Sequence, residues 1–195
     1  IDKYEVTNAL YKACVGEGFC GPPQENGSYE RVHYYDNSEF DNYPVISVDW
    51  NQANAYCEWR GTQLPTEAQW EKAARGTDGR TYPWGEGPDC SKANYNGCQS
   101  DTAVVGGYES GISPYGLYDM AGNVWEWVAD WYSDTYYQSS LLSNPLGPES
   151  GELKLKSLRG GSWAKDEISL RSAHRGWLAA NLWSNLVGFR CARTP

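Results

Sequence analysis

The sequence is poor in residues that bind metals and nucleic acids. Its 195 residues include only two histidines, His33 and His174, and the 16 basic side chains are outnumbered by 25 acidic ones, for a formal net charge of −9. Because nucleic-acid affinity comes from Lys and Arg that neutralise phosphates, this balance argues against a nucleic-acid partner and an anionic membrane surface. No run approaches the roughly 20 apolar residues needed to cross a bilayer, so no membrane insertion is expected.

Methionine and phenylalanine are scarce, and other aromatic residues replace them. The chain has one Met and three Phe, but ten Trp and 15 Tyr, with 21 Gly and 10 Pro. Such a composition favours turns and short strands over long helices, and Trp and Tyr suit both a loop-rich core and a binding surface. The length fits one domain, 1–195. Because the first residue is Ile and no signal peptide is present, we expect a segment cut from a longer chain.

The six cysteines lack the spacing of a zinc site, since none forms a C-x-x-C pair. An even number with two short spacings favours the disulfides Cys14–Cys20 and Cys90–Cys98, which leaves Cys57–Cys191 by elimination. Other connectivities stay open, and reduced thiols in a cytoplasmic protein are the alternative. Disulfides indicate an extracellular or cell-surface location.

Local patterns predict short regular elements. Thr66 and Gln69 have the spacing of a capping box, which predicts a helix that stops at Gly76. The remaining expected elements are a strand over 2–6 leading into a short helix capped by Thr7 or Asn8, a loop over 20–44, a strand over 45–48, a helix over 49–59, and strands near 125–131, 156–163 and 188–193. This is an α+β pattern with short strands, two main helices and much irregular loop.

A series of segments forms one pattern when taken together in chain order. The segments are Tyr4–Asn8, Pro44–Trp50, Ala55–Trp59, Leu64–Glu71, Tyr82–Gly85, Gly116–Trp127, Asn144–Pro148, Arg159–Trp163 and Gly188–Ala192. This pattern resembles the formylglycine-generating-enzyme, or sulfatase-modifying-factor, domain. The resemblance spans nearly the whole chain and implies a C-type-lectin-like fold.

The residues that this family uses for catalysis are missing. The resemblance implies an oxidase with copper on two cysteines a few residues past the Gly-Gly-Ser-aromatic motif, yet the stretch 164–170 contains no Cys. It also implies that Cys57 and Cys191 form a structural disulfide, so they are not spare ligands. Thiolates select Cu(I), so no copper is expected. No iron is expected either, because the family's iron enzymes need two or three His at one site. We therefore expect no enzyme activity; an oxidase-type enzyme of this family or its accessory domain is the alternative.

Structural Ca²⁺ is the cofactor that the resemblance implies. Its ligands would be the side chains of Asp119 and Glu126 and the carbonyls of Met120, Gly122 and Val124, a mixed oxygen set that suits this ion. The alternative is that the two carboxylates bond only to backbone amides.

The C-terminal segment has a frame and a filling of different character. The frame, 159–163, 170–173, Arg175 and 188–190, resembles that of the variable proteins of diversity-generating retroelements, which implies a diversified surface for a protein or other surface ligand. The filling consists of 164–169, His174 and 176–187, and its last stretch is either a hairpin packed on the core or an exposed aromatic patch. A structural module of a surface protein is a further alternative. The candidate ligand-binding residues are Trp163, Lys165, Asp166, Glu167, Ser169, His174, Trp177, Leu178, Asn181, Leu182, Trp183 and Asn185.

Overall fold

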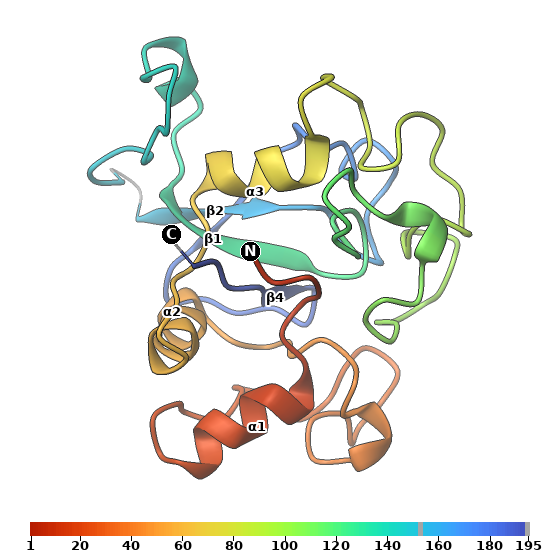
Figure 1. Ribbon diagram of the computed structural model, residues 1–195. Coiled ribbons are helices and arrows are strands. Elements are labelled where there is room, and N and C mark those ends of the chain that lie inside the picture. Colours follow the sequence, from red (N-terminus) through yellow and green to blue (C-terminus); the bar gives the residue numbers. More distant parts are fainter. Residues whose placement is uncertain (152–153, 194–195) are drawn as a thin grey trace.

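A computed structural model describes residues 1–151 and 154–193 and places a four-stranded sheet at the centre of them (Figure 1). The order across the sheet is β3-β2-β1-β4. β2 runs antiparallel to both of its neighbours, whereas β4 runs parallel to β1, so β3 is an edge strand with a single partner. The strands are β1 (Trp125–Trp131), β2 (Leu155–Arg159), β3 (Gly176–Ala179) and β4 (Val187–Phe189).

Helices cover both faces of this sheet. α3 packs on β1 and β2, and α2 packs on β1 from the opposite side together with α1 (Figure 1). Within the described residues, no helix is long and apolar enough to cross a membrane. The helices are α1 (Asn8–Gly16), α2 (Trp50–Trp59) and α3 (Glu67–Arg75), with 3-10 turns η1 (Ser38–Phe40), η2 (Glu109–Gly111) and η3 (Tyr136–Gln138).

The helix starts follow the sequence signals. Thr7 caps α1, and Asp49 caps α2. At α3, the Thr66 side chain accepts the backbone N–H of Gln69 and the Gln69 side chain accepts that of Thr66, so the expected capping box is confirmed. The same helix ends at Gly76, whose φ of 71° is open to glycine without a Cβ clash.

Two predicted strands are wrong. Residues 2–6 and 45–48 form no ladder, and their backbone pairing is limited to single hydrogen bonds such as that from Val45 N–H to the Val6 carbonyl at 2.8 Å. Ser47, with φ of 58°, interrupts the second run before a ladder can form. The strand expected over 156–163 ends earlier, at Arg159, because Gly160 and Gly161 both adopt positive φ. β3 falls in the segment that the sequence analysis treated as filling.

The three predicted disulfides are confirmed. Cys14–Cys20 and Cys90–Cys98 close short loops, whereas Cys57–Cys191 joins α2 to the segment after β4 across a sequence separation of 134. Both partners of this long link are fully buried in the main core. That core includes Tyr11, Val45, Tyr56, Trp127 and Phe189.

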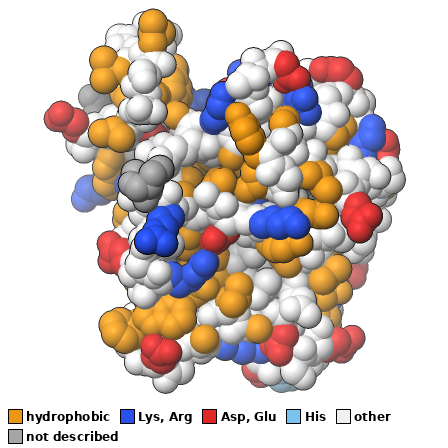
Figure 2. Space-filling model, in the orientation of Figure 1, with side chains coloured by type: hydrophobic (Ala, Val, Ile, Leu, Met, Phe, Trp, Pro, Cys, Tyr) orange, Lys and Arg blue, Asp and Glu red, His pale blue; other side chains and the backbone are white. Residues whose placement is uncertain are grey.

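Residues 132–151 leave the body of the domain between β1 and β2 and project from it (Figure 1). Figure 2 shows hydrophobic side chains on this projection, while over the rest of this face charged and hydrophobic side chains are interspersed. Leu141, Leu142 and Leu146 are its exposed leucines.

Candidate ligand-binding surface

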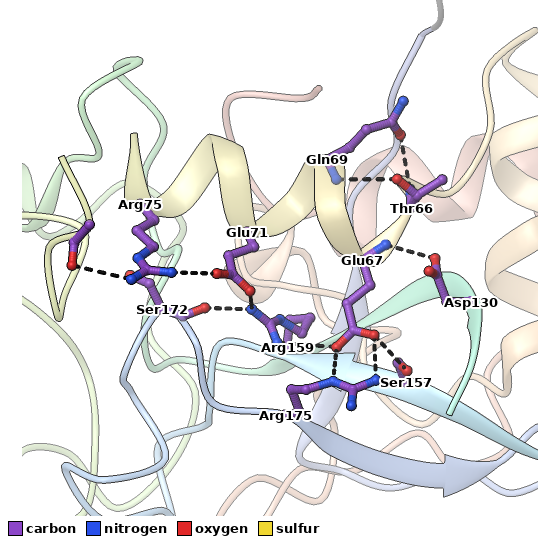
Figure 3. Close-up of polar contacts among 11 residues, drawn as sticks. Thr66, Glu67, Gln69, Glu71, Arg75, Asp130, Ser157, Arg159, Ser172 and Arg175 are labelled. Carbon is purple, nitrogen blue, oxygen red and sulfur yellow. Dashed lines mark hydrogen bonds and ion pairs between the residues drawn. The ribbon is translucent and has the colours of Figure 1, made fainter. Parts of the chain in front are cut away.

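Two arginines of the expected frame converge on one buried carboxylate (Figure 3). Glu67, in the first turn of α3, accepts hydrogen bonds from Arg159 Nη1 at 3.1 Å and from Arg175 Nε and Nη2 at 2.6 and 2.8 Å. Ser157 donates another at 3.2 Å. These charge-assisted bonds tie α3 to the residue that precedes β3. Arg175 also donates to the carbonyl of Ser133 at 2.7 Å, so it links the loop after β1 to the start of β3.

Side chains on both faces of β1 and β2 hold the sheet beside β3. On the α3 face, Asp130 accepts the backbone N–H of Glu67 at 2.7 Å, and burial raises the pKa of this aspartate to about 7. On the other face, the ammonium of Lys156 lies 3.9 Å from the ring centroids of both Trp50 and Trp131. Burial lowers the pKa of Lys156 to about 8.

β3 divides its side chains between surface and core, because neighbours in a strand point to opposite faces. Leu178 packs against the main core, whereas Trp177 is 54% exposed. The Trp177 ring lies 6.3 Å from that of Tyr132, and the Arg175 guanidinium lies 4.8 Å from the same Tyr132 ring. Trp177 therefore stands exposed on a fixed support, while Leu178, expected among the ligand contacts, lies beneath it.

The turn after β3 carries a second exposed tryptophan. Its backbone is tied to the start of α2, since Trp50 N–H donates to the Ala180 carbonyl at 3.2 Å and Ser47 N–H donates to that of Ser184 at 3.1 Å. The predicted ligand residues along this turn are the exposed Asn181, Leu182 (50%) and Trp183 (36%) and the half-buried Asn185.

Two other predicted ligand-binding residues, Trp163 and His174, are buried or half-buried. Trp163 is only 7% exposed, and its ring packs 5.2 Å from that of Tyr29. His174 is half-buried, with its ring 5.9 Å from that of Trp125, and burial lowers the pKa of this histidine. Trp163 thus belongs to the packed frame, and Tyr29 presents the exposed ring at this position.

Residues 164–168 form an exposed loop with a fixed backbone. The Lys165 carbonyl accepts the N–H of Asn96 at 3.0 Å, and the Asp166 carboxylate accepts the N–H and hydroxyl of Ser169 at 3.1 and 2.9 Å. The side chains of Lys165, Asp166 and Glu167 are exposed, and Ser169 is half-buried. The structure therefore brings the candidate residues into two exposed stretches, 164–169 and 177–185, with His174 between them in the chain.

The acidic end of the predicted calcium site lies in a buried turn. Gly122 and Asn123 have φ of 81° and 58°, which gives the tight turn. Asp119 Oδ2 accepts the backbone N–H of Gly106 at 2.7 Å, and the carbonyls of Met120 and Gly122 accept no hydrogen bond from the described residues. Burial raises the pKa of Asp119 to about 6, and a bound cation would offset this cost.

Glu126 does not fit this ligand set. Arg190 Nε and Nη2 donate to its two oxygens at 2.7 Å each, and Trp70 Nε1 donates at 2.8 Å. Among the described residues, no group of three or more His, Cys, Asp or Glu side chains is arranged to hold a metal ion. The predicted ligands outside this Glu126–Arg190 ion pair are Asp119 and the carbonyls of Met120, Gly122 and Val124.

The central role of Glu67 was not predicted. A carboxylate in the first turn of a helix has a sufficient local explanation in the helix dipole, and its partners Arg159 and Arg175 lie 92 and 108 residues away. Tyr29 and Tyr132 carried no signal either, because they lie in irregular segments without periodicity.

Comparison with known proteins agrees with this geometry. The model of the sulfatase-modifying factor enzyme 1-like domain matches residues 1–195. The serine/threonine-protein kinase Pkn1 of Chlamydia trachomatis is 47% identical over 154 residues, which cover 77% of this chain and 24% of that protein. The formylglycine-generating enzyme of Streptomyces coelicolor is 40% identical over 171 residues, 77% of this chain and 52% of the enzyme.

An inactive relative and a solved structure extend the comparison. The inactive C-alpha-formylglycine-generating enzyme 2 of Bos taurus is 37% identical over 169 residues, 77% of this chain and 50% of that protein. The structure of Treponema denticola variable protein 1 superposes with a TM-score of 0.78 at 27% identity, covering 98% of this chain and 84% of that one. The chain spans from about a quarter to about half of the curated relatives it matches. It belongs to the sulfatase-modifying factor enzyme 1-like domain family.

Proposed function

We propose that this chain is a non-catalytic ligand-binding domain of the retroelement-diversified kind, whose binding surface is formed by residues 164–169 and 177–185. The observation that carries the proposal is the exposure of Trp177 and Trp183 on backbone that hydrogen bonds hold in place. Exposed Trp on a fixed scaffold supplies binding energy at a low entropic cost. The similarity to a variable protein supports this function.

The two alternatives for 176–187, a hairpin packed on the core and an exposed patch, predict different burial of Trp177 and Trp183. A hairpin packed over the core would bury both tryptophans, whereas the residues of 176–187 in or against the main core are Leu178, Leu186 and Val187. A purely structural module has no need of the exposed Trp177, Leu182 and Trp183, because exposed apolar area favours association. The exposed patch therefore explains more of this segment than either alternative.

A role without oxidase chemistry is favoured by the state of the cysteines. All six are paired in disulfides, so the side chains present do not fit a thiolate copper site. The family includes a protein named as inactive, so loss of activity has a precedent among the relatives. We also infer from the three disulfides an oxidising compartment or a cell-surface location.

We further propose a structural Ca²⁺ held by Asp119 and the carbonyls of Met120, Gly122 and Val124, without Glu126. The buried Asp119 carboxylate, with its raised pKa, supports this assignment. When bound, the ion would neutralise the negative charge of this buried carboxylate.

Sequencing codons 159–193 across many clones of the source population tests the proposed function. We expect dense substitutions at exposed positions of 164–169 and 177–185, because these side chains carry no packing constraint. Arg159, Arg175 and Leu178 should stay fixed, since Glu67 and the core hold them. A single invariant sequence, or substitutions spread evenly over both groups, would remove the diversified surface.

A further inference from the structure

The two edges of the sheet differ in what covers them. Beside β4 runs the N-terminal segment, where Val6 N–H donates to the Phe189 carbonyl at 2.9 Å and Asp2 N–H to that of Cys191 at 2.8 Å (Figure 1). Within residues 1–151 and 154–193, β3 pairs only with β2. The sheet therefore has one covered edge and one open edge, and the open edge is the strand that carries Trp177.

Two hydrogen bonds fix which way the backbone of β2 faces. Tyr132 N–H donates to the Leu155 carbonyl at 2.8 Å, so Leu155 faces β1. Ala180 N–H donates to the Lys154 carbonyl at 3.3 Å, so Lys154 faces the β3 side. Bonded pairs alternate along an antiparallel ladder, and the register pairs Leu155 with Ala179. Ala179 is thus a position whose backbone groups point away from β2.

The same alternation identifies the free groups of β3. Gly176 and Leu178 face β2, whereas Trp177 and Ala179 turn their N–H and C=O groups outward. The Ala179 carbonyl already accepts a hydrogen bond from Leu182 N–H at 2.9 Å. Among the described residues, the N–H and C=O of Trp177 and the N–H of Ala179 have no hydrogen-bond partner. They form an outward donor, acceptor and donor row.

Of the features that usually prevent strand addition, this edge has only its short length. Natural edge strands also carry Lys, Pro or a bulge, but the four residues of β3 read Gly-Trp-Leu-Ala and all pair in regular register. We propose that the β3 edge binds an extended peptide segment of a partner protein as a fifth strand, with Trp177, Leu182 and Trp183 contacting its side chains. This inference rests on the proposed ligand-binding function and specifies the class of ligand.

A partner peptide suits this edge better than a second copy of the chain. A second copy offers only another four-residue strand, in which the Ala179 carbonyl is already bonded to Leu182. A longer extended segment pairs with the free groups of Trp177 and Ala179. Because Leu182 N–H donates to the outward Ala179 carbonyl, Leu182 lies beside this end of the edge, next to the added segment.

The probe is a phage-displayed library of random linear heptapeptides, selected on the disulfide-bonded domain and then resynthesised. We expect Ala179→Pro, which removes an outward N–H and no hydrogen bond within the protein, to weaken the selected peptides at least tenfold. Ala179→Val keeps the N–H and should bind as wild type does. N-methylation should abolish binding at the peptide residue whose N–H donates to the Trp177 carbonyl, the free outward acceptor of β3, and should spare its two neighbours, whose N–H groups face away from β3.

The outcomes separate this inference from the proposed function. If Ala179→Pro does not fold, the N-methylation pattern decides alone. Strand addition is overturned if peptide binding survives both Ala179→Pro and N-methylation at every position. It is also overturned if the selection yields no peptide, or if the molecular mass of the domain doubles with protein concentration because two copies pair through β3. If Trp177→Ala alone then abolishes binding, the exposed patch stands and only the edge is lost. Peptide binding that is indifferent to Trp177→Ala and Trp183→Ala contradicts the patch itself.

Discussion

Replacing Cys57 and Cys191 together by alanine is expected to lower the free energy of unfolding by about 5 kcal/mol. The bond closes a loop with a sequence separation of 134, and a longer loop removes more entropy from the unfolded chain. Alanine avoids placing a polar group at two fully buried positions. Urea unfolding at equilibrium, without reductant, measures the loss.

The matched control is the alanine pair at Cys90 and Cys98. This bond spans a separation of 8 and lies at the surface, so the same relation gives a loss of about 2.5 kcal/mol. Equal losses for the two pairs would show that loop length does not set the stabilisation. A loss below about 2 kcal/mol for the long loop would contradict its place as the main covalent link of the core.

Without calcium, ionisation of the buried Asp119 is expected to lower the free energy of unfolding as the pH rises from about 4 to about 6. Burial raises the pKa of Asp119 from 3.8 to about 6, so the folded state holds this proton more tightly than the unfolded state does. The penalty is absent below pH 4, grows between the two pKa values and is complete above pH 6, where it amounts to about 3 kcal/mol.

The comparison of wild type with Asp119→Asn tests this effect. The pKa of Glu5 is raised by burial and, next, by the charge of Asp119, so the pH dependence from Glu5 is also smaller in the variant. Because the amide side chain of the variant cannot ionise, the variant should show a smaller fall in stability than wild type when both are measured with a calcium chelator. Saturating Ca²⁺ should raise the melting temperature of wild type at pH 7 and leave the variant unchanged. If Ca²⁺ moves neither protein, the calcium assignment is wrong.

The helices could be predicted because their signals are local. Thr66, Gln69 and Gly76 lie within one short segment, and the capping box and glycine stop depend on few other residues. The disulfides were predicted because short spacings leave few partners. Strand positions were less well predicted, since a ladder depends on what lies beside it. Residues 45–48 have a strand-like composition, yet Ser47 at positive φ and scattered partners keep them out of the sheet.

The candidate site shows the same division between local and distant causes. The sequence identified the segment that carries Trp177 and Trp183, but alternation in an edge strand decides that Trp177 is exposed and Leu178 buried. The sequence around Trp163 does not predict that the Tyr29 ring packs against it, because Tyr29 lies far away in the chain. For Glu126, the ion pair with Arg190 depends on the parallel pairing of β1 and β4, which no local pattern encodes.

The central claim is that Trp177 and Trp183 belong to a surface for binding and not to the core. Urea unfolding of Trp177→Ala and Trp183→Ala tests it without knowledge of the ligand. We expect each change to lower the free energy of unfolding by less than about 2 kcal/mol, because Trp177 and Trp183 are 54% and 36% exposed and bury only part of their area. Trp127→Ala, at a fully buried position, is the control and should lose about 3–5 kcal/mol. A loss of about 3–5 kcal/mol for the two exposed tryptophans would instead place them in the core and contradict the account.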